Sequence, residues 1–271
     1  MYRRVAQLTC ERLEDKASQV RKNAIQLLTS LLQYNPYGSQ LSATIFRQNL
    51  EATQAELIAK IGEHDLTFAE DEEYNPQEGD NESMALYVRC KYLMDTLAFI
   101  AILKKSVPSV CDLLGSKNAT DVMEAVAFFS MAFNFSVESG REGIKKMLML
   151  VWSKEASIKD ALLNSYRDLY MTKPNNLEPK LATLFVAKNL ISLTRDANLG
   201  ELTSLEELFG IAMQQKLIKK DVIDMLWDMF ASKTLKVKKR DDGKGALVVL
   251  TMLANADNQM IHDHLNTIVN I

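Results

Sequence analysis

The chain has 271 residues, of which 47% are hydrophobic and 25% are charged. This composition is ordinary for a globular protein and excludes a disordered, collagen-like or fibrous chain. Lys and Arg number 32 against 35 Asp and Glu, a net charge of −3, so any nucleic-acid binding would need a local basic patch. The three cysteines have no paired spacing. They argue against a disulfide framework or a cysteine zinc site and fit a reducing compartment.

Helix-period patterning runs along nearly the whole chain. Apolar residues recur at steps of three and four, as in Ala24, Leu27, Leu28 and Leu31. No segment alternates between glycine-rich turns in the way that strands do, and only ten Gly and five Pro interrupt the pattern. We therefore predict an all-α protein of about a dozen helices, each of about 10–20 residues.

Turn residues predict where several of these helices begin and end. Pro36 and Pro174 should each end a helix, because the residue before a proline is disfavoured in the helical region. Ser153, and Thr203 followed three residues later by Glu206, are typical of helix starts.

The sequence shows no sign of a targeting or membrane segment. The first residues lead into a mixed stretch and not into an apolar core of a signal peptide. The longest apolar stretches, residues 97–103 and 125–133, fall far short of the ~20 residues that a spanning helix needs. We expect a soluble intracellular protein with no membrane partner.

Residues 63–82 differ from the rest of the chain in charge. They contain nine acidic residues and no Lys or Arg. Because like charges repel and little apolar surface offsets the ordering entropy, we predict a disordered acidic loop between two helices. A solvated linker is the simpler interpretation of this loop, and an autoinhibitory or partner-binding element is the alternative.

One segment carries the signature of a HEAT repeat. Asp15 lies in a turn, Val20 and Arg21 open the next helix, and Ala24 precedes a pair of leucines. In such a repeat the Asp can cap the second helix, the Arg can reach turn groups of a neighbouring repeat, and the Ala allows close helix packing. A weaker copy follows at residues 153–163. We predict that residues 1–271 form one continuous HEAT-repeat solenoid of stacked antiparallel helix pairs.

Longer blocks around this signature resemble a known family. Residues 20–28, followed by the turn at residues 34–37, resemble condensin subunit 1, the D2-type HEAT-repeat regulatory subunit of condensin. Residues 120–129, 143–155 and 163–170 are similar to the same family. Members of this family are far longer than 271 residues, so the resemblance implies that the chain is an interior fragment.

The resemblance implies a non-catalytic scaffold that acts in mitotic chromosome condensation. Its expected partners are the kleisin subunit, the SMC ATPase heads and double-stranded DNA, and ATP hydrolysis would belong to the SMC subunits. The expected location is the nucleus and chromosomes, with a cytoplasmic pool. Two alternatives stay open: a HEAT adaptor of another assembly, such as a transport factor or phosphatase scaffold, and an all-α enzyme.

Residues 233–245 contain the sharpest local candidate for a binding site. Six basic residues fall within twelve positions, and the segment ends in a Gly-Lys-Gly turn. Basic side chains on a loop can neutralise phosphates, and glycines let backbone N–H groups approach them. Condensin HEAT subunits are similar in having a Lys-Gly loop at a functional surface. The alternative is a solvated basic turn that Asp241 and Asp242 balance. The candidate DNA- or partner-binding residues are Lys236, Lys238, Lys239, Arg240, Lys244 and Gly245.

A second candidate comes from clustered aromatic residues. Phe128, Phe129, Phe133 and Phe135 bring four of the ten phenylalanines into eight positions. They could line a groove that receives an extended kleisin segment, or they could be solenoid core.

No motif predicts catalysis, a metal or a cofactor. His262 and His264 are two positions apart, so on a helix their imidazoles point away from each other and cannot share one ion. Gly243-Lys244-Gly245 lacks the other residues of a phosphate-binding P-loop, and no nucleophile motif occurs. We therefore expect no enzyme activity, no cofactor and no metal site.

Overall fold

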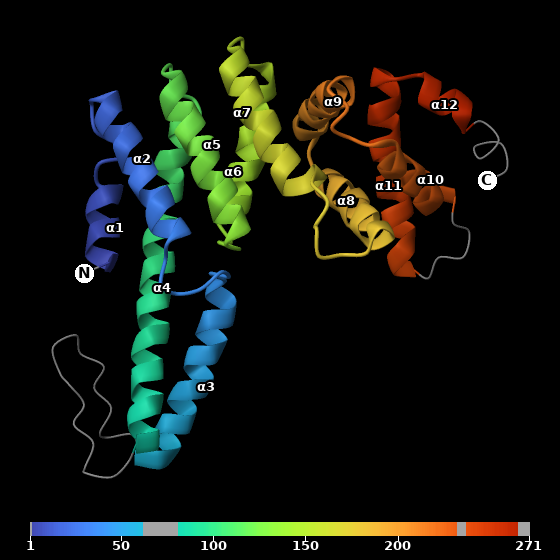
Figure 1. Ribbon diagram of the computed structural model, residues 1–271. Coiled ribbons are helices and arrows are strands. Elements are labelled where there is room, and N and C mark those ends of the chain that lie inside the picture. Colours follow the sequence, from blue (N-terminus) through green and yellow to red (C-terminus); the bar gives the residue numbers. More distant parts are fainter. Residues whose placement is uncertain (1, 62–80, 232–236, 265–271) are drawn as a thin grey trace. The chain divides into compact units, whose positions relative to one another are not determined.

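The structure is a computed structural model, and it describes residues 2–61, 81–231 and 237–264. Within these residues every regular element is a helix, which confirms the predicted all-α class (Figure 1). The chain divides into two compact units, Met1–Ile144 and Lys145–Ile271. Among the described helices none is long and apolar enough to cross a membrane.

The first unit is built on two helix pairs. Helix α1 (Tyr2–Cys10) pairs with α2 (Ser18–Gln33), and the later part of α4 (Asn81–Leu113) pairs with α5 (Ala119–Asn134). In the stack, α2 packs on α5 and α1 packs on α4. The layers bury aliphatic and aromatic side chains: Ile25, Leu28, Leu32, Phe99, Leu103, Val126 and Phe129.

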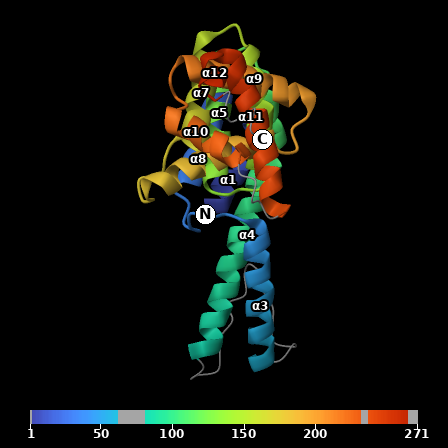
Figure 2. The same cartoon turned by 90° about the vertical axis from the view of Figure 1, so that its right-hand side faces the viewer.

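A helical hairpin extends from the first unit. Helix α3 (Ala43–Ile61) runs beside the first part of α4, and both views show these two helices projecting beyond α1 and α5 (Figures 1 and 2). Leu57, Tyr87 and Cys90 form the core of the hairpin, with Leu50 and Leu86 packed against them. Helix α4 has 33 residues, so the prediction of helices no longer than about 20 residues is wrong here.

The second unit begins within helix α6 (Gly140–Met147), which leads into a 3₁₀ helix, η2 (Leu148–Trp152). Helix α11 (Val237–Ala256) is central in this unit, because it packs against α8, α9 and α10. The remaining elements are α7 (Ala156–Tyr166), the π-helix η3 (Arg167–Met171), α8 (Pro179–Thr194), α9 (Leu199–Gln214), α10 (Lys220–Ala231) and α12 (Gln259–Asp263).

The predicted helix boundaries were right at the prolines, whereas the helix predicted to start at Ser153 begins at Ala156 and Ser153 does not cap it. Helix α2 ends at Gln33 before Pro36, and η3 ends at Met171 before Pro174. The Ser153 hydroxyl accepts from the Glu155 N–H at 3.2 Å, just before α7. The start predicted at Thr203 is wrong, because Thr203 lies inside α9.

Helix α9 begins four residues earlier than Thr203 and is capped by a different pair. The Asn198 side chain accepts from the Glu201 N–H at 3.0 Å, and the Glu201 carboxylate accepts from the Asn198 N–H at 2.9 Å. This reciprocal capping box satisfies two backbone donors that the start of the helix leaves unpaired.

Candidate interaction surfaces

Arg21 joins the two helix pairs of the first unit. Its Nη1 donates to the backbone oxygens of Asp15 at 2.8 Å and Lys16 at 3.1 Å, in the turn between α1 and α2. Its Nη2 donates to Asp121 Oδ2 at 2.6 Å, in the first turn of α5. The expectation that this arginine reaches the next repeat is confirmed. Asp15 does not cap α2, because it accepts from the Ala17 N–H that precedes the helix.

Asp121 is the buried partner in this contact. Its side chain is 0% exposed, and the Arg21 side chain is 18% exposed. Ser116 Oγ also donates to Asp121 Oδ2, at 3.0 Å. Burying a carboxylate is costly unless charge and hydrogen bonds compensate it, so the register between the two helix pairs depends on Arg21.

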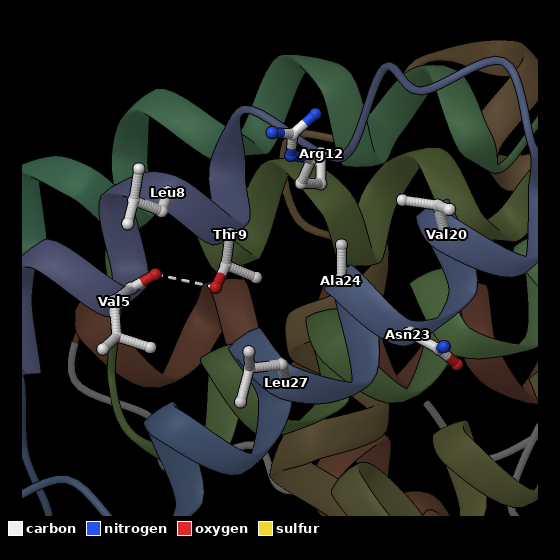
Figure 3. Close-up of a pocket in the computed structure, with 8 residues that line it drawn as sticks. All are labelled: Val5, Leu8, Thr9, Arg12, Val20, Asn23, Ala24 and Leu27. Carbon is white, nitrogen blue, oxygen red and sulfur yellow. Dashed lines mark hydrogen bonds between the residues drawn. The ribbon is translucent and has the colours of Figure 1, made fainter.

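An apolar pocket of about 430 Å³ opens between α1 and α2 on the side of this pair that carries Val20 and Leu27 (Figure 3). Val5 and Leu8 line it from α1, and Val20 and Leu27 line it from α2. Leu8 is 52% exposed and Leu27 is 43% exposed. Leu27, which belongs to the apolar stripe of the sequence, therefore faces this pocket, as does Val20.

Helix α5 shows what covers the corresponding face in the next pair. When α2 and α5 are aligned at their first residues, Val20, Asn23 and Leu27 of α2 correspond to Asp121, Glu124 and Phe128 of α5. Asp121 and Glu124 each accept a hydrogen bond from α2, and Phe128 is buried. The pocket thus lies on the face of α2 that corresponds to the face of α5 on which α2 packs.

The phenylalanine groove is only partly compatible with the structure. Phe128 and Phe129 are 1% and 0% exposed, and their rings pack edge to face at 5.4 Å. Gly143 lets α6 approach the ring of Phe129, because a Cβ there would lie 1.9 Å from Phe129 Cδ1. These two rings are core and cannot receive a partner segment. Phe133 and Phe135 are half-buried, and for them the groove stays a prediction.

The basic segment is helical where the structure describes it. Lys236 lies outside the described residues, while the backbone of residues 237–240 forms the first turn of α11. The loop predicted over residues 233–245 is therefore wrong from Val237 onward. Gly245 serves helix packing, because a Cβ on it would lie 2.4 Å from Ile191 Cγ2 of α8.

The two acids of this segment have different surroundings. Asp242 accepts from Arg195 Nη2 at 2.9 Å, so a cation of the α8–α9 connection already engages it. Asp241 and Lys244 are exposed. Of the predicted acidic loop, residues 63–80 lie outside the described residues, and Asn81 and Glu82 begin α4.

Sequence reasoning did not select Trp152. The residue is 51% exposed, and its Nε1 donates to the buried Ser204 Oγ of α9 at 3.1 Å. The residue lies on an apolar helical stripe, which predicts core, so no signal in the sequence marks it as a surface aromatic. Within the described part of the chain, no three His, Cys, Asp or Glu side chains gather as a metal-binding group.

These packed helix pairs, with an arginine–aspartate contact linking one pair to the next, define an all-α solenoid of the HEAT-repeat class. No family model matches the chain. A designed armadillo repeat protein covers 92% of the chain at 11% identity, with a TM-score of 0.26. So low a score adds nothing to the assignment of the fold.

Curated relatives place the chain more closely. Condensin complex subunit 1 of Saccharomyces cerevisiae is 30% identical over 97% of this chain and 28% of the relative. Condensin-1 complex subunit CAP-D2 of Arabidopsis thaliana is 25% identical over 100% of this chain and 22% of the relative. Condensin complex subunit 1 of Homo sapiens is 28% identical over 73% of this chain and 14% of the relative. The chain belongs to the condensin complex subunit 1 family, and it spans less than a third of the length of these relatives.

Proposed function

We propose that the chain acts as a non-catalytic scaffold segment of a condensin complex, in the nucleus and on chromosomes with a cytoplasmic pool. The observation that carries this proposal is the similarity to condensin subunits over nearly the whole chain. The Arg21–Asp121 contact is compatible with it, because it fixes one helix pair on the next. The curated relatives are condensin subunits, and they give no support to a transport or phosphatase scaffold.

The scaffold's DNA contact is the first turn of α11. Lys238, Lys239 and Arg240 lie in sequence at the positive end of the helix dipole, where cations are unfavourable and anions are favourable. A phosphate backbone is an anion that both this helix end and three consecutive basic residues would favour. Lys236 and Lys244 extend the basic segment to either side, and Arg195 reduces the opposing charge of Asp242.

Charge reversal tests this binding of DNA. Lys238→Glu, Lys239→Glu and Lys244→Glu combined should weaken binding of a DNA duplex and flatten its dependence on log salt by about one unit for each phosphate that the protein no longer neutralises. The matched control reverses three exposed lysines elsewhere in the second unit: Lys154, Lys180 and Lys188. An unchanged salt slope in the first variant would refute the DNA assignment.

The scaffold's protein partners would be the kleisin subunit and the SMC ATPase heads. For the kleisin, the half-buried rings of Phe133 and Phe135 at the end of α5 offer aromatic anchors of the kind that dominate interfaces. No residue of the chain is assigned to the ATPase heads.

Co-purification with segments of a condensin kleisin, compared with kleisins of related complexes, tests the kleisin proposal. Phe133→Ala with Phe135→Ala should release the bound segment, whereas Tyr34→Ala, at a residue that is 75% exposed in the same unit, should not. A folded chain that captures no kleisin, or captures all kleisins equally, contradicts the proposal. Measurable turnover of nucleotides or phosphoesters by the pure chain would contradict the non-catalytic role.

A further inference from the structure

The second unit contains a pocket that none of the surfaces above includes. It has a volume of about 500 Å³ and is lined by residues of the α9–α10 turn, of α10 and of the segment around α12. The α9–α10 turn and the α11–α12 connection both contribute residues to it, together with the first turns of α10. Its lining includes Met213, Lys216, Ile218, Lys219, Ile223 and Met260.

The lining includes buried and half-buried apolar side chains. Ile218, Ile223 and Met260 are 6%, 8% and 6% exposed, and Met213 is half-buried. Two of these four residues are methionines, whose flexible and polarisable side chains adapt to ligands of different shape. An apolar lining of this size suits one large aliphatic or aromatic side chain of a partner.

Three exposed lysines share the pocket with this apolar lining. Lys216, Lys219 and Lys220 make no ion pair among the described residues. The turn that carries Lys216 is fixed: the Lys216 N–H donates to Met213 O and the Leu217 N–H donates to Ala212 O, both at 2.9 Å, with Lys216 at φ 56°. This Schellman closure of α9 holds the lysines at the pocket instead of on a freely moving loop.

The two acids at the pocket, Asp224 and Asp257, offset part of this charge, but the three lysines outnumber them. Asp257 Oδ1 accepts from the Gln259 N–H at 3.0 Å, inside its own turn. Asp224 Oδ1 lies 3.8 Å from His264 Nε2. The His264 ring stacks on Trp227 at 4.7 Å with an interplanar angle of 5°, and its Nδ1 lies 3.1 Å from Met260 O. One acid is thus held in its own turn, and the other faces an imidazole that is fixed in place.

We propose that this pocket binds an acidic linear peptide segment of a partner protein, with one large apolar side chain inserted and flanking carboxylates on the three lysines. Apolar lining and positive charge complement these two features of such a segment. A nucleic acid would use the lysines and leave the apolar lining empty. The proposal needs neither the DNA contact at α11 nor the phenylalanine surface, so each can fail separately.

Fluorescence anisotropy tests the proposal on the 271-residue chain with a defined probe. The probe is a fluorescein-labelled peptide with one leucine and one phenylalanine between runs of glutamate. We expect binding to weaken by about tenfold or more when serines replace the leucine and phenylalanine, and again when glutamines replace the glutamates. The peptide changes leave the protein intact, so they do not depend on the folding of a variant.

The protein variant combines Lys219→Glu with Lys220→Glu. It should fold, because Lys220 is the first residue of α10 and a carboxylate is favourable at a helix start. Its affinity for the peptide should fall by about tenfold or more. The affinity of the control variant, Lys180→Glu with Lys188→Glu, should not change.

Three results would overturn the proposal. The first is no binding of the probe to the wild-type chain, and the second is equal binding of the serine peptide, which would indicate a polyanion surface only. The third is concentration-dependent self-association that Lys219→Glu with Lys220→Glu abolishes, because that result would assign the pocket to a second copy of this chain.

Discussion

Arg21 and Asp121 lie 100 residues apart in the chain and share a 2.6 Å hydrogen bond between guanidinium and carboxylate. The same arginine binds two backbone oxygens of its own turn, so one side chain fixes both the turn and the next helix pair. Asp121 Oδ1 has no hydrogen-bond partner among the described residues. The carboxylate therefore depends on Arg21 and Ser116 for its compensation.

Removing the arginine should destabilise the first unit strongly. Arg21→Leu leaves the fully buried Asp121 carboxylate without its cation, which costs about 3–5 kcal/mol in similar cases. Chemical denaturation of the chain would measure the loss. Arg3→Ala is the control, because the Arg3–Asp95 pair is 35% and 51% exposed and should contribute about 1 kcal/mol or less. Equal effects of the two variants would show that the Arg21 contact is no stronger than a surface pair.

Glu138 should make the base of the hairpin sensitive to pH. Its carboxylate accepts from the Thr44 N–H and hydroxyl and from the Ser42 hydroxyl at the start of α3. The side-chain hydrogen bond from Thr44, then the backbone one, lowers the pKa of Glu138 below its ordinary value of 4.5. Because the pKa of Glu138 is lower in the folded than in the unfolded chain, its carboxylate contributes fully to folding stability above the unfolded pKa. That contribution is lost as the pH falls through the folded pKa.

Glu138→Gln removes this titration. Near neutral pH the variant should be less stable by up to about 1 kcal/mol, the usual size of a helix cap. The gap to wild type should close in acid, once the pH falls below the lowered pKa of the wild-type carboxyl and that group is protonated too. Thermal unfolding followed by circular dichroism across this range measures the gap, and a gap that is the same at every pH contradicts the capping role.

Gly245 and Gly210 should respond in opposite directions to alanine. A Cβ at Gly245 would lie 2.4 Å from Ile191 Cγ2, whereas one at Gly210 would meet only Ala256 Cβ at 4.0 Å. Gly245→Ala should therefore cost about 1–3 kcal/mol through overpacking. Gly210→Ala should gain up to about 1 kcal/mol of helix propensity. Urea denaturation separates the two outcomes, and a neutral Gly245→Ala would mean that α11 and α8 can separate without loss.

Leu57→Ala should loosen the hairpin more than the helix pairs. Leu57 is 0% exposed and forms the hairpin core with Tyr87 and Cys90. Truncating a buried leucine typically costs about 2–5 kcal/mol. Amide hydrogen exchange should accelerate in α3 and the first part of α4, while the α2–α5 layer keeps its protection. Uniform acceleration across the first unit would show that the hairpin and the helix pairs unfold together.

Sequence reasoning succeeded where one local signal decides the structure. Pro36 and Pro174 limit helices because of sterics within a few residues, and the HEAT signature at Asp15 to Leu28 depends on short spacings. The family resemblance was also carried by short blocks, and the relatives confirm it.

Other failures have a different cause, which is tertiary packing. Gly243 and Gly245 predict a turn, yet Gly245 lies in a helix whose contact with Ile191 requires the missing side chain. Packing also outweighs a local signal at Pro108, where α4 continues to Leu113 with Val107, Val110 and Cys111 buried. From the sequence alone, Phe128 and Phe129 could line a groove or lie in the core. They lie in the core because α2 and α6 pack against α5.

Helix α4 belongs to two structures at once. Its first part holds the hairpin core through Tyr87 and Cys90, and its later part packs on α1 and α5 without a break between them. Mechanical load on the hairpin is therefore carried by an unbroken rod into the layer that contains Phe99 and Leu103. A molecule that grips and tilts the hairpin would turn that rod about its packed end, as a lever turns about its fulcrum, and would press on the neighbouring α1 and α5.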